Sequence, residues 1–190
     1  MAVRDIVRMG HPVLRKNAIA YPREKIGAPA FATLIADMKD TMANAGGIGL
    51  AAPQINESVQ IAVIEVPASG SRYGDHEALP FAVYINPVVT VLDAETAGYW
   101  EGCLSVPGLM GYVERPQHVR IDYIDEYNQA KSLVAQGFTA TVFQHELDHL
   151  IGRLYVDRLA DTTQLAYVEE YAAFIAQDGS TERASDPPDE

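Results

Sequence analysis

The stretch Gln144-His-Glu-Leu-Asp-His-Leu-Ile-Gly152 lies in a segment that we expect to be a helix over residues 139–151. Apolar side chains form a stripe along this segment, as in a helix that packs against a core. Gly152 provides a stop, because glycine readily adopts the left-handed conformation that follows many helices. The stripe comprises Val142, Phe143, Leu147 and Leu150. We therefore predict a largely buried helix at the centre of the fold.

The same stretch carries the motif H-E-x-x-H, formed by His145, Glu146 and His149. Side chains four residues apart lie on one face of a helix, so both imidazoles can reach one metal ion. Glu146 can take a proton from a metal-bound water without occupying a coordination position. Because buried histidines beside acids need a partner, the pattern favours a metal site over an ordinary polar helix face.

A catalytic metal usually has three protein ligands, so a third one is needed. In the metzincin extension of the motif a histidine would stand where this chain has Tyr155, which disfavours that class. A thermolysin-like site would use Glu169 or Glu170. The remaining candidate is Cys103 in Glu101-Gly-Cys-Leu-Ser-Val-Pro107, because a thiolate and two imidazoles suit Fe²⁺, Zn²⁺ or Ni²⁺.

The other elements follow from periodicity and turn residues. A helix is predicted at residues 29–45, where apolar residues recur every three or four positions before Gly46-Gly47. Segments rich in β-branched and aromatic residues predict short strands at 60–66, 81–86, 88–92, 118–124 and 131–136. A loop is expected at 67–75 and a third helix at 164–176. This order predicts an α+β fold in which short, mainly antiparallel sheets wrap around the central metal-binding helix, with a C-terminal helix.

Length and composition limit the organisation of the chain. With 190 residues, 48% of them hydrophobic, the chain fits one domain with a sizeable core. We expect residues 1–176 to form a single catalytic domain. Residues 177–190 are acidic and poor in apolar side chains, so we expect a disordered tail there.

Charge and cysteine content exclude several classes of protein. There are 26 acidic and 14 basic residues, a net charge of −12, and such a surface repels phosphate backbones. We therefore expect no direct binding of nucleic acid. A single cysteine excludes an intramolecular disulfide, and no apolar run reaches the ~18 residues of a membrane span. These features indicate a cytoplasmic protein with no membrane segment.

Three blocks occur in a fixed order: Gly47-Ile-Gly-Leu-Ala-Ala-Pro-Gln54, the Glu101–Ser105 segment, and the stretch from Gln144 to Gly152. Together they resemble the peptide deformylases, and the likeness extends over residues 8–159. Such enzymes remove the formyl group from N-formylmethionine at the start of a new bacterial or organellar polypeptide and release formate. The resemblance also implies that the substrates are nascent chains, with transient contact with the ribosome.

The resemblance implies one divalent metal ion, usually Fe²⁺ in the cell, with Zn²⁺, Ni²⁺ or Co²⁺ able to replace it. Its ligands would be Cys103, His145 and His149, with water in the fourth position. Glu146 would be the general acid and base.

Further roles also follow from the resemblance. The side-chain amide of Gln54 and the backbone N–H of Leu104 would stabilise the oxyanion. Side chains near the metal, including Leu104, would form a flexible apolar pocket for methionine. The residues expected to contact substrate are Gly47, Ile48, Gly49, Gly102 and Val142.

Two positions depart from the family pattern. Met110 stands where many relatives carry an arginine, and Glu114 stands where a proline is expected. Neither residue is an expected metal ligand. The departures concern how the substrate is held beyond its methionine.

Two other functions remain open from the sequence. One is a zincin-type metallopeptidase with His145, His149 and either Glu169 or Glu170 as ligands. The other is a module that binds metal or peptide without catalysis. Glu146 and Gln54 favour an enzyme over such a module, because both residues have roles in the chemical step.

Overall fold

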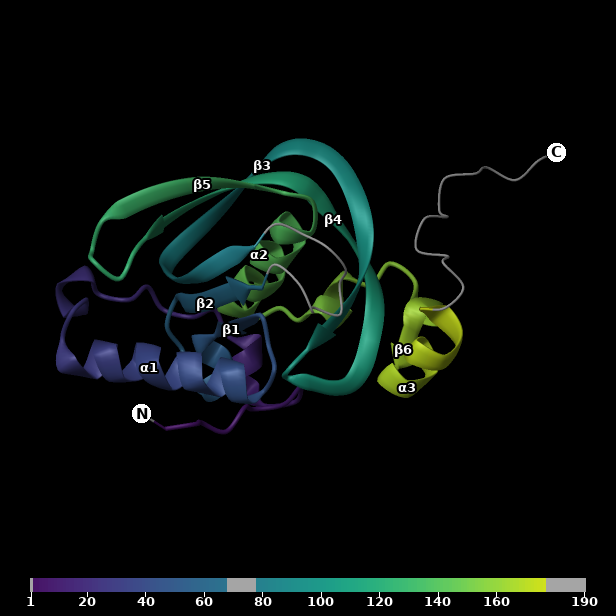
Figure 1. Ribbon diagram of the computed structural model, residues 1–190, viewed down its shortest axis with the longest axis horizontal. Helices are drawn as coiled ribbons and strands as arrows, with labels where there is room; N and C mark the ends of the chain where they lie inside the picture. Colours follow the sequence, from purple (N-terminus) through teal and green to yellow (C-terminus); the bar gives the residue numbers. More distant parts are fainter. Residues whose placement is uncertain (1, 68–77, 177–190) are drawn as a thin grey trace.

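The computed structural model describes residues 2–67 and 78–176. The acidic tail expected at 177–190, and all but the first residue of the loop expected at 67–75, lie outside the described residues. Helices and an antiparallel sheet combine in one arrangement, as Figure 1 shows. The predicted α+β class is therefore confirmed.

Helix α2, Gly137–Leu150, lies inside the curve formed by the long strands (Figure 1). The prediction of a buried helix at 139–151 is confirmed, since Phe143 and His149 are fully buried. The apolar stripe packs against strand residues in one core cluster, which includes Ile64, Val119 and Ile121. The helix that carries both histidines is thus fixed from several sides.

Within residues 2–67 and 78–176 the sheet has six strands, which pair antiparallel in the order β1-β2-β3-β4-β5, while β6 pairs with β4. The strands are β1 Gly49–Ala51, β2 Ile61–Val66, β3 Leu79–Cys103, β4 Val106–Ile124, β5 Ala130–Gln136 and β6 Leu165–Tyr167. Alternate side chains of β2 enter different cores. Ala62 and Ile64 face α2, whereas Ile61 and Val63 face helix α1, Pro29–Asn44.

Strands β3 and β4 are longer than the short strands we predicted. The segments predicted at 81–86 and 88–92 are parts of one strand, and the segment at 118–124 is the end of β4. Shifts of register between Ile85 and Val88 and between Val91 and Asp93 mark bulges, which bend a strand without ending it. The two strands therefore form one curved ribbon that wraps around α2 (Figure 1).

Helix α1, Pro29–Asn44, confirms the helix predicted at 29–45. Its residues Phe31, Met38 and Met42 are buried in the second core, and Gly46 follows with a φ of 66°. In the described part of the chain, five short 3₁₀ segments connect the main elements. They are η1 Pro12–Arg15, η2 Arg23–Lys25, η3 Ala52–Ile55, η4 Tyr155–Arg158 and η5 Thr162–Gln164.

The C-terminal helix is present but begins later than predicted. Residues 165–167 form β6, followed by α3, Val168–Glu170, and a π-helical turn, η6, Tyr171–Ile175. The prediction of helix from residue 164 is wrong because β6 pairs with Leu109–Gly111 of β4. None of the helices in the described ranges is long and apolar enough to span a bilayer.

Gly152 is required by its surroundings. Its φ is +72°, and a Cβ there would lie 2.8 Å from the carbonyl carbon of Arg15. We expect Gly152→Ala to lower the free energy of unfolding by at least about 1 kcal/mol more than Gly27→Ala does, measured by urea denaturation. Gly27 is a matched control, because its φ is +84° but nothing lies within 4 Å of its Cβ position. Equal losses in the two variants would contradict the steric argument.

Candidate active site

Three potential metal ligands meet where β3 ends beside α2. One ligand atom each of Cys103, His145 and His149 lies within 4.8 Å of the other two. The Sγ atom of Cys103 is 3.4 Å from Nε2 of His149. Glu169 and Glu170, in α3, are exposed and do not belong to this group. The structure therefore favours Cys103 as the third ligand over the zincin alternative.

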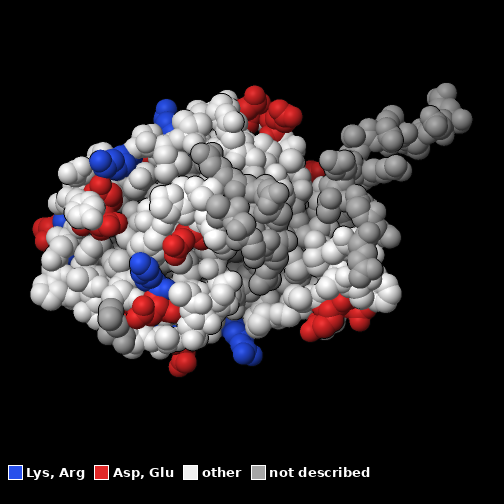
Figure 2. All heavy atoms as spheres, viewed as in Figure 1, with Lys and Arg blue, Asp and Glu red and all other residues white. Residues whose placement is uncertain are grey.

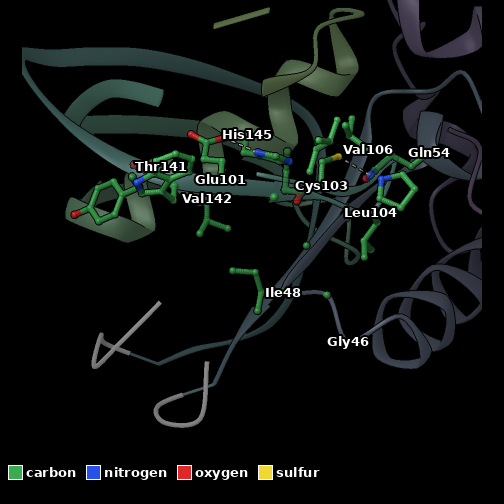
Figure 3. A pocket seen from close by; sticks show the side chains of 18 of the residues that line it. Gly46, Ile48, Gln54, Glu101, Cys103, Leu104, Val106, Thr141, Val142 and His145 are labelled. Carbon is green, nitrogen blue, oxygen red and sulfur yellow. Dashed lines mark hydrogen bonds and ion pairs between the residues drawn. The ribbon is translucent and has the colours of Figure 1, made fainter. Parts of the chain in front are cut away.

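His145 is oriented by a buried carboxylate. Its Nδ1 atom lies 2.7 Å from Oε2 of Glu101, which leaves Nε2 for the metal side of the ring (Figure 3). A histidine that binds a metal usually makes such a hydrogen bond through its other nitrogen, which fixes the tautomer and the ring plane. Glu101 itself lies two residues before Cys103 in β3. One short segment thus supplies both a candidate ligand and the support for another.

Arg115 connects this carboxylate to α2. The guanidinium donates to both oxygens of Glu101, at 2.6 and 3.0 Å, and to Oδ2 of Asp148 at 2.8 Å. Arg158 adds two hydrogen bonds to the same aspartate. Only 3% of Arg115 is exposed. Burial raises the pKa of Glu101, but hydrogen bonds from His145 and Arg115 hold it below its ordinary value.

We did not predict Arg115, Glu101 or Asp148 as parts of the site. Asp148 stands inside the motif, but a polar residue there also fits an exposed helix position. Arg115 is 14 residues from Glu101, and the two meet only because β3 and β4 pair as an antiparallel ribbon. A single sequence does not reveal this pairing.

Removing the buried guanidinium is expected to destabilise the fold strongly. Arg115→Leu leaves the carboxylates of Glu101 and Asp148 buried without it, and we expect the free energy of unfolding to fall by about 3–5 kcal/mol. Urea denaturation of the metal-free protein measures this. Arg120→Leu is the matched control in the same strand, because its ion pair with Asp122 is about half exposed and its loss should change the stability little. Similar losses in both variants would contradict a structural role for the buried network.

The neighbouring histidines favour the thiolate form of Cys103. Burial would raise the pKa of the thiol, but the neighbouring His149 and His145 lower it to about 5. Burial alone would lower the pKa of His145, but Cys103 and Glu101 raise it well above its ordinary value. A thiolate is the form of cysteine that binds metals.

Glu146 is buried next to the three candidate ligands. Burial raises the pKa of its carboxyl group, and the two histidines only partly oppose this. A Cβ on Gly49 would collide with this carboxylate, so the glycine allows the close approach of β1. Among the described residues, none makes a hydrogen bond to Oε2 of Glu146 or to Nδ1 of His149. Buried polar atoms of this kind usually have a partner, and the donor set fits a divalent metal ion and a polar ligand.

The side-chain amide of Gln54 lies next to Cys103. Its side chain is buried, and Oε1 accepts a hydrogen bond from the backbone N–H of Ala51. This fixes the amide so that Nε2 lies 3.6 Å from Sγ of Cys103 (Figure 3) and 3.3 Å from Oγ of Ser105. Gln54 therefore lies beside Cys103, one of the three candidate metal ligands.

A cavity of about 710 Å³ opens beside these groups. Every residue predicted to contact substrate lines it, as do Gln54, Cys103, Leu104, His145 and Glu146, whereas His149 is fully buried and is not part of the lining. The lining residues that were not predicted include Tyr99, Trp100, Phe138 and Thr141. The volume is within the range of sites that hold a small molecule or a short peptide segment.

The two departures from the family pattern lie outside the cavity lining. Met110 is 3% exposed and pairs with Gly102 on one side and Ala166 of β6 on the other. Glu114 is exposed and pairs with Gly98. Met110 therefore occupies a buried position of β4 between β3 and β6.

Two imidazoles and a thiolate suit one divalent ion, and a buried carboxylate beside them suits proton transfer. The amide of Gln54 suits a negative charge that develops on a substrate oxygen. The class of protein that this fold and site define is a metal-dependent hydrolase.

Comparison with known proteins identifies the family. Residues 3–165 match the sequence model described as Polypeptide deformylase. The peptide deformylase of Leptospira biflexa is 42% identical over 170 residues, which are 90% of this chain and 95% of that protein. Peptide deformylase 2 of Pseudomonas syringae is 43% identical over 167 residues, covering 88% and 93%. The chain belongs to the polypeptide deformylase family.

Solved structures agree with this assignment. The Met-Ala-Ser-bound class I type b peptide deformylase of Acinetobacter baumannii superposes with a TM-score of 0.79 at 32% identity, covering 83% of this chain and 99% of that one. The actinonin complex of the Synechococcus elongatus enzyme gives 0.73 at 38% identity, covering 85% and 81%. The activity of this chain is the metal-dependent hydrolysis of the formyl group from formylmethionyl peptides.

Proposed function

We propose that Cys103, His145 and His149 hold one divalent metal ion and that this ion is Fe²⁺ in the cell. The observation that carries the proposal is that three ligand atoms of suitable chemistry lie within 4.8 Å of one another, one of them on a histidine oriented by Glu101. Zn²⁺, Ni²⁺ and Co²⁺ also suit a thiolate and two imidazoles. A divalent metal ion lowers the pKa of water from about 15.7 to around 7, which supplies hydroxide at neutral pH.

Glu146 moves the protons of the reaction. Its carboxylate accepts the proton of the attacking water and later delivers it to the leaving amine of methionine. The raised pKa of this buried group supports the role, because a general base works best when its pKa lies near the working pH.

Gln54 and Leu104 stabilise the oxyanion that forms when the formyl carbon is attacked. The Nε2 amide of Gln54 and the backbone N–H of Leu104 donate hydrogen bonds to it. Since Ala51 holds the amide in place, the donor needs little reorganisation during the reaction.

Loss of the amide donor is expected to slow the chemical step. Gln54→Ala should lower kcat by about 10²–10³-fold, the usual effect of removing one oxyanion donor, with metal content unchanged. Formate release and metal analysis of the same samples measure both quantities. Gln60→Ala is the control, because Gln60 is a partly buried glutamine that bonds the carbonyl of Ala18 away from the cavity. A variant with normal kcat, or one that has lost its metal, would contradict the assigned role.

The peptide lies in an extended conformation between two backbone edges. One edge is Gly47-Ile48-Gly49 and the other is Gly102 in β3, and both line the cavity. The methionine side chain enters the apolar region formed by Ile48, Leu104 and Val142.

We also propose that residues 1–176 act as one catalytic domain in the cytoplasm and meet nascent chains through transient contact with the ribosome. No direct binding of nucleic acid is proposed. Figure 2 shows one face of the molecule, and on the described part of this face the lysine and arginine side chains are separated from one another. The face therefore offers no basic patch for a phosphate backbone. The net charge of −12 acts in the same direction.

The proposed function is tested with formyl-Met-Ala-Ser and protein loaded with Fe²⁺ or Ni²⁺ without oxygen. We expect one formate to be released for each peptide consumed, and no cleavage between the amino acids. Mass spectrometry of the products checks both expectations. Acetyl-Met-Ala-Ser is the control for the size of the acyl group. Cleavage of an internal peptide bond without formate release would favour a peptidase instead.

A further inference from the structure

One wall of the cavity contains Trp100, the only tryptophan of the chain. Trp100 precedes Glu101 in β3, and Glu101 faces α2 through His145. Because successive side chains of a strand point to opposite faces, the indole points away from α2. There its ring packs on Tyr171, with 4.9 Å between centroids. Trp100 therefore connects the active-site strand to the C-terminal segment.

The C-terminal segment reaches the cavity through β6. Pairing of Leu109 with Tyr167 places the start of α3 beside β4, and Val168 lines the cavity. Residues 166–176 lie beyond the part of the chain that matches the family model. We call Trp100, Val168 and Tyr171 the C-terminal wall.

The edge of β3 next to this wall can pair with a peptide. In the described part of the chain, residues 96–103 have a strand partner on one side only, which is β4. An extended peptide can add to such an edge. With its formyl group beside Cys103, the peptide runs past Gly102 toward Trp100.

Alternate side chains of an extended peptide point to opposite sides of its backbone. The methionine side chain points toward α2, where Val142 and Phe138 line the cavity. The side chain of the following residue then points to the other face, which carries the indole of Trp100. The topology therefore brings the second residue of the substrate to the C-terminal wall.

We propose that the C-terminal wall is a subsite for the side chain that follows methionine and that it selects apolar side chains at this position. The inference rests on the peptide orientation given under the proposed function. An indole and a valine offer apolar surface, which a leucine side chain covers and an alanine side chain leaves in contact with water.

The test compares kcat/KM for formyl-Met-Leu-Ser and formyl-Met-Ala-Ser. We expect kcat/KM of the metal-loaded protein to be about tenfold higher for the leucine peptide, mainly because KM is lower. This is the effect expected when several methylene groups of the side chain are buried in a half-open site. In Trp100→Ala the preference should fall to within about twofold, mainly because kcat/KM for the leucine peptide falls. Phe174→Ala, which changes a 68% exposed aromatic residue of the same segment outside the cavity lining, should keep the preference.

Fluorescence of Trp100 gives a second measurement that needs no turnover. Titration with the product peptides Met-Leu-Ser and Met-Ala-Ser should change its emission, with Kd about tenfold lower for the leucine peptide. Tyr171→Ala keeps the fluorophore but removes its support, so it should bring the two Kd values together even if Trp100→Ala folds poorly.

The two kinds of failure are distinguishable. Equal Kd and kcat/KM values for the two peptides, or a preference unchanged in both Trp100→Ala and Tyr171→Ala, would overturn the subsite. If no formylated peptide is hydrolysed but Trp100 fluorescence still separates the two products, the proposed function fails and the subsite stands.

Discussion

Glu146→Gln is expected to lower kcat/KM for formyl-Met-Ala-Ser by about 10²–10⁴-fold, the range that general acid–base catalysis contributes. The change keeps the size of the side chain but removes the group that accepts and returns a proton. Because Glu146 is not one of the three candidate ligands, the metal content should stay at that of the unchanged protein. Formate release and metal analysis on the same preparation measure both quantities.

Glu114→Gln is the matched control for this change. Glu114 is an exposed residue of β4 outside the cavity lining, so its loss of charge should leave kcat/KM within about twofold. If Glu146→Gln retains full activity, Glu146 is not the proton carrier. If the variant instead loses its metal, Glu146 serves the metal site rather than the chemical step.

Cys103→Ala is expected to abolish stable metal binding and with it the activity. Two imidazoles remain, and a catalytic divalent ion usually needs three protein ligands. The bound metal should fall from about one ion per chain to near zero after gel filtration, and formate release should fall by at least about 10³-fold. The fold should be retained, because the substitution removes only the sulfur atom of a residue at the end of β3. Circular dichroism checks this.

A double variant, Glu169→Ala with Glu170→Ala, separates this site from the zincin alternative. Both residues are exposed in α3, so the variant should keep its metal and its activity. Loss of metal in the double variant, with metal retained in Cys103→Ala, would return the third ligand to the C-terminal segment.

Local patterns were sufficient to predict the centre of the fold. The stripe of Val142, Phe143, Leu147 and Leu150 and the stop at Gly152 predicted α2, because a helix is defined by contacts between residues close in sequence. His145 and His149 followed from the same periodicity. Their meeting with Cys103 and Gln54 was implied by the resemblance to a family, since these residues come from distant parts of the chain.

The long ribbon and its buried network could not be predicted in this way. Residues 91–97 of β3 are all exposed and lack the alternation that marks a strand, so β3 looked like separate short segments. Its pairing with β4 brings Arg115 to Glu101, and no local pattern distinguishes Arg115 from an ordinary surface arginine. Similarly, residues 165–167 form a strand because β4 offers an edge there, although the local sequence favours a helix.

The central claim is that one metal ion, held by Cys103, His145 and His149, enables this chain to deformylate peptides with Glu146 as the proton carrier. It is tested most directly by adding Fe²⁺ or Ni²⁺ stepwise to metal-free protein and measuring formate release from formyl-Met-Ala-Ser. We predict that the rate rises linearly to one metal equivalent and then stays constant, and that Glu146→Gln binds the same one equivalent without comparable turnover. Activity that persists in Cys103→Ala, or no formate release at full metal occupancy, would contradict the account.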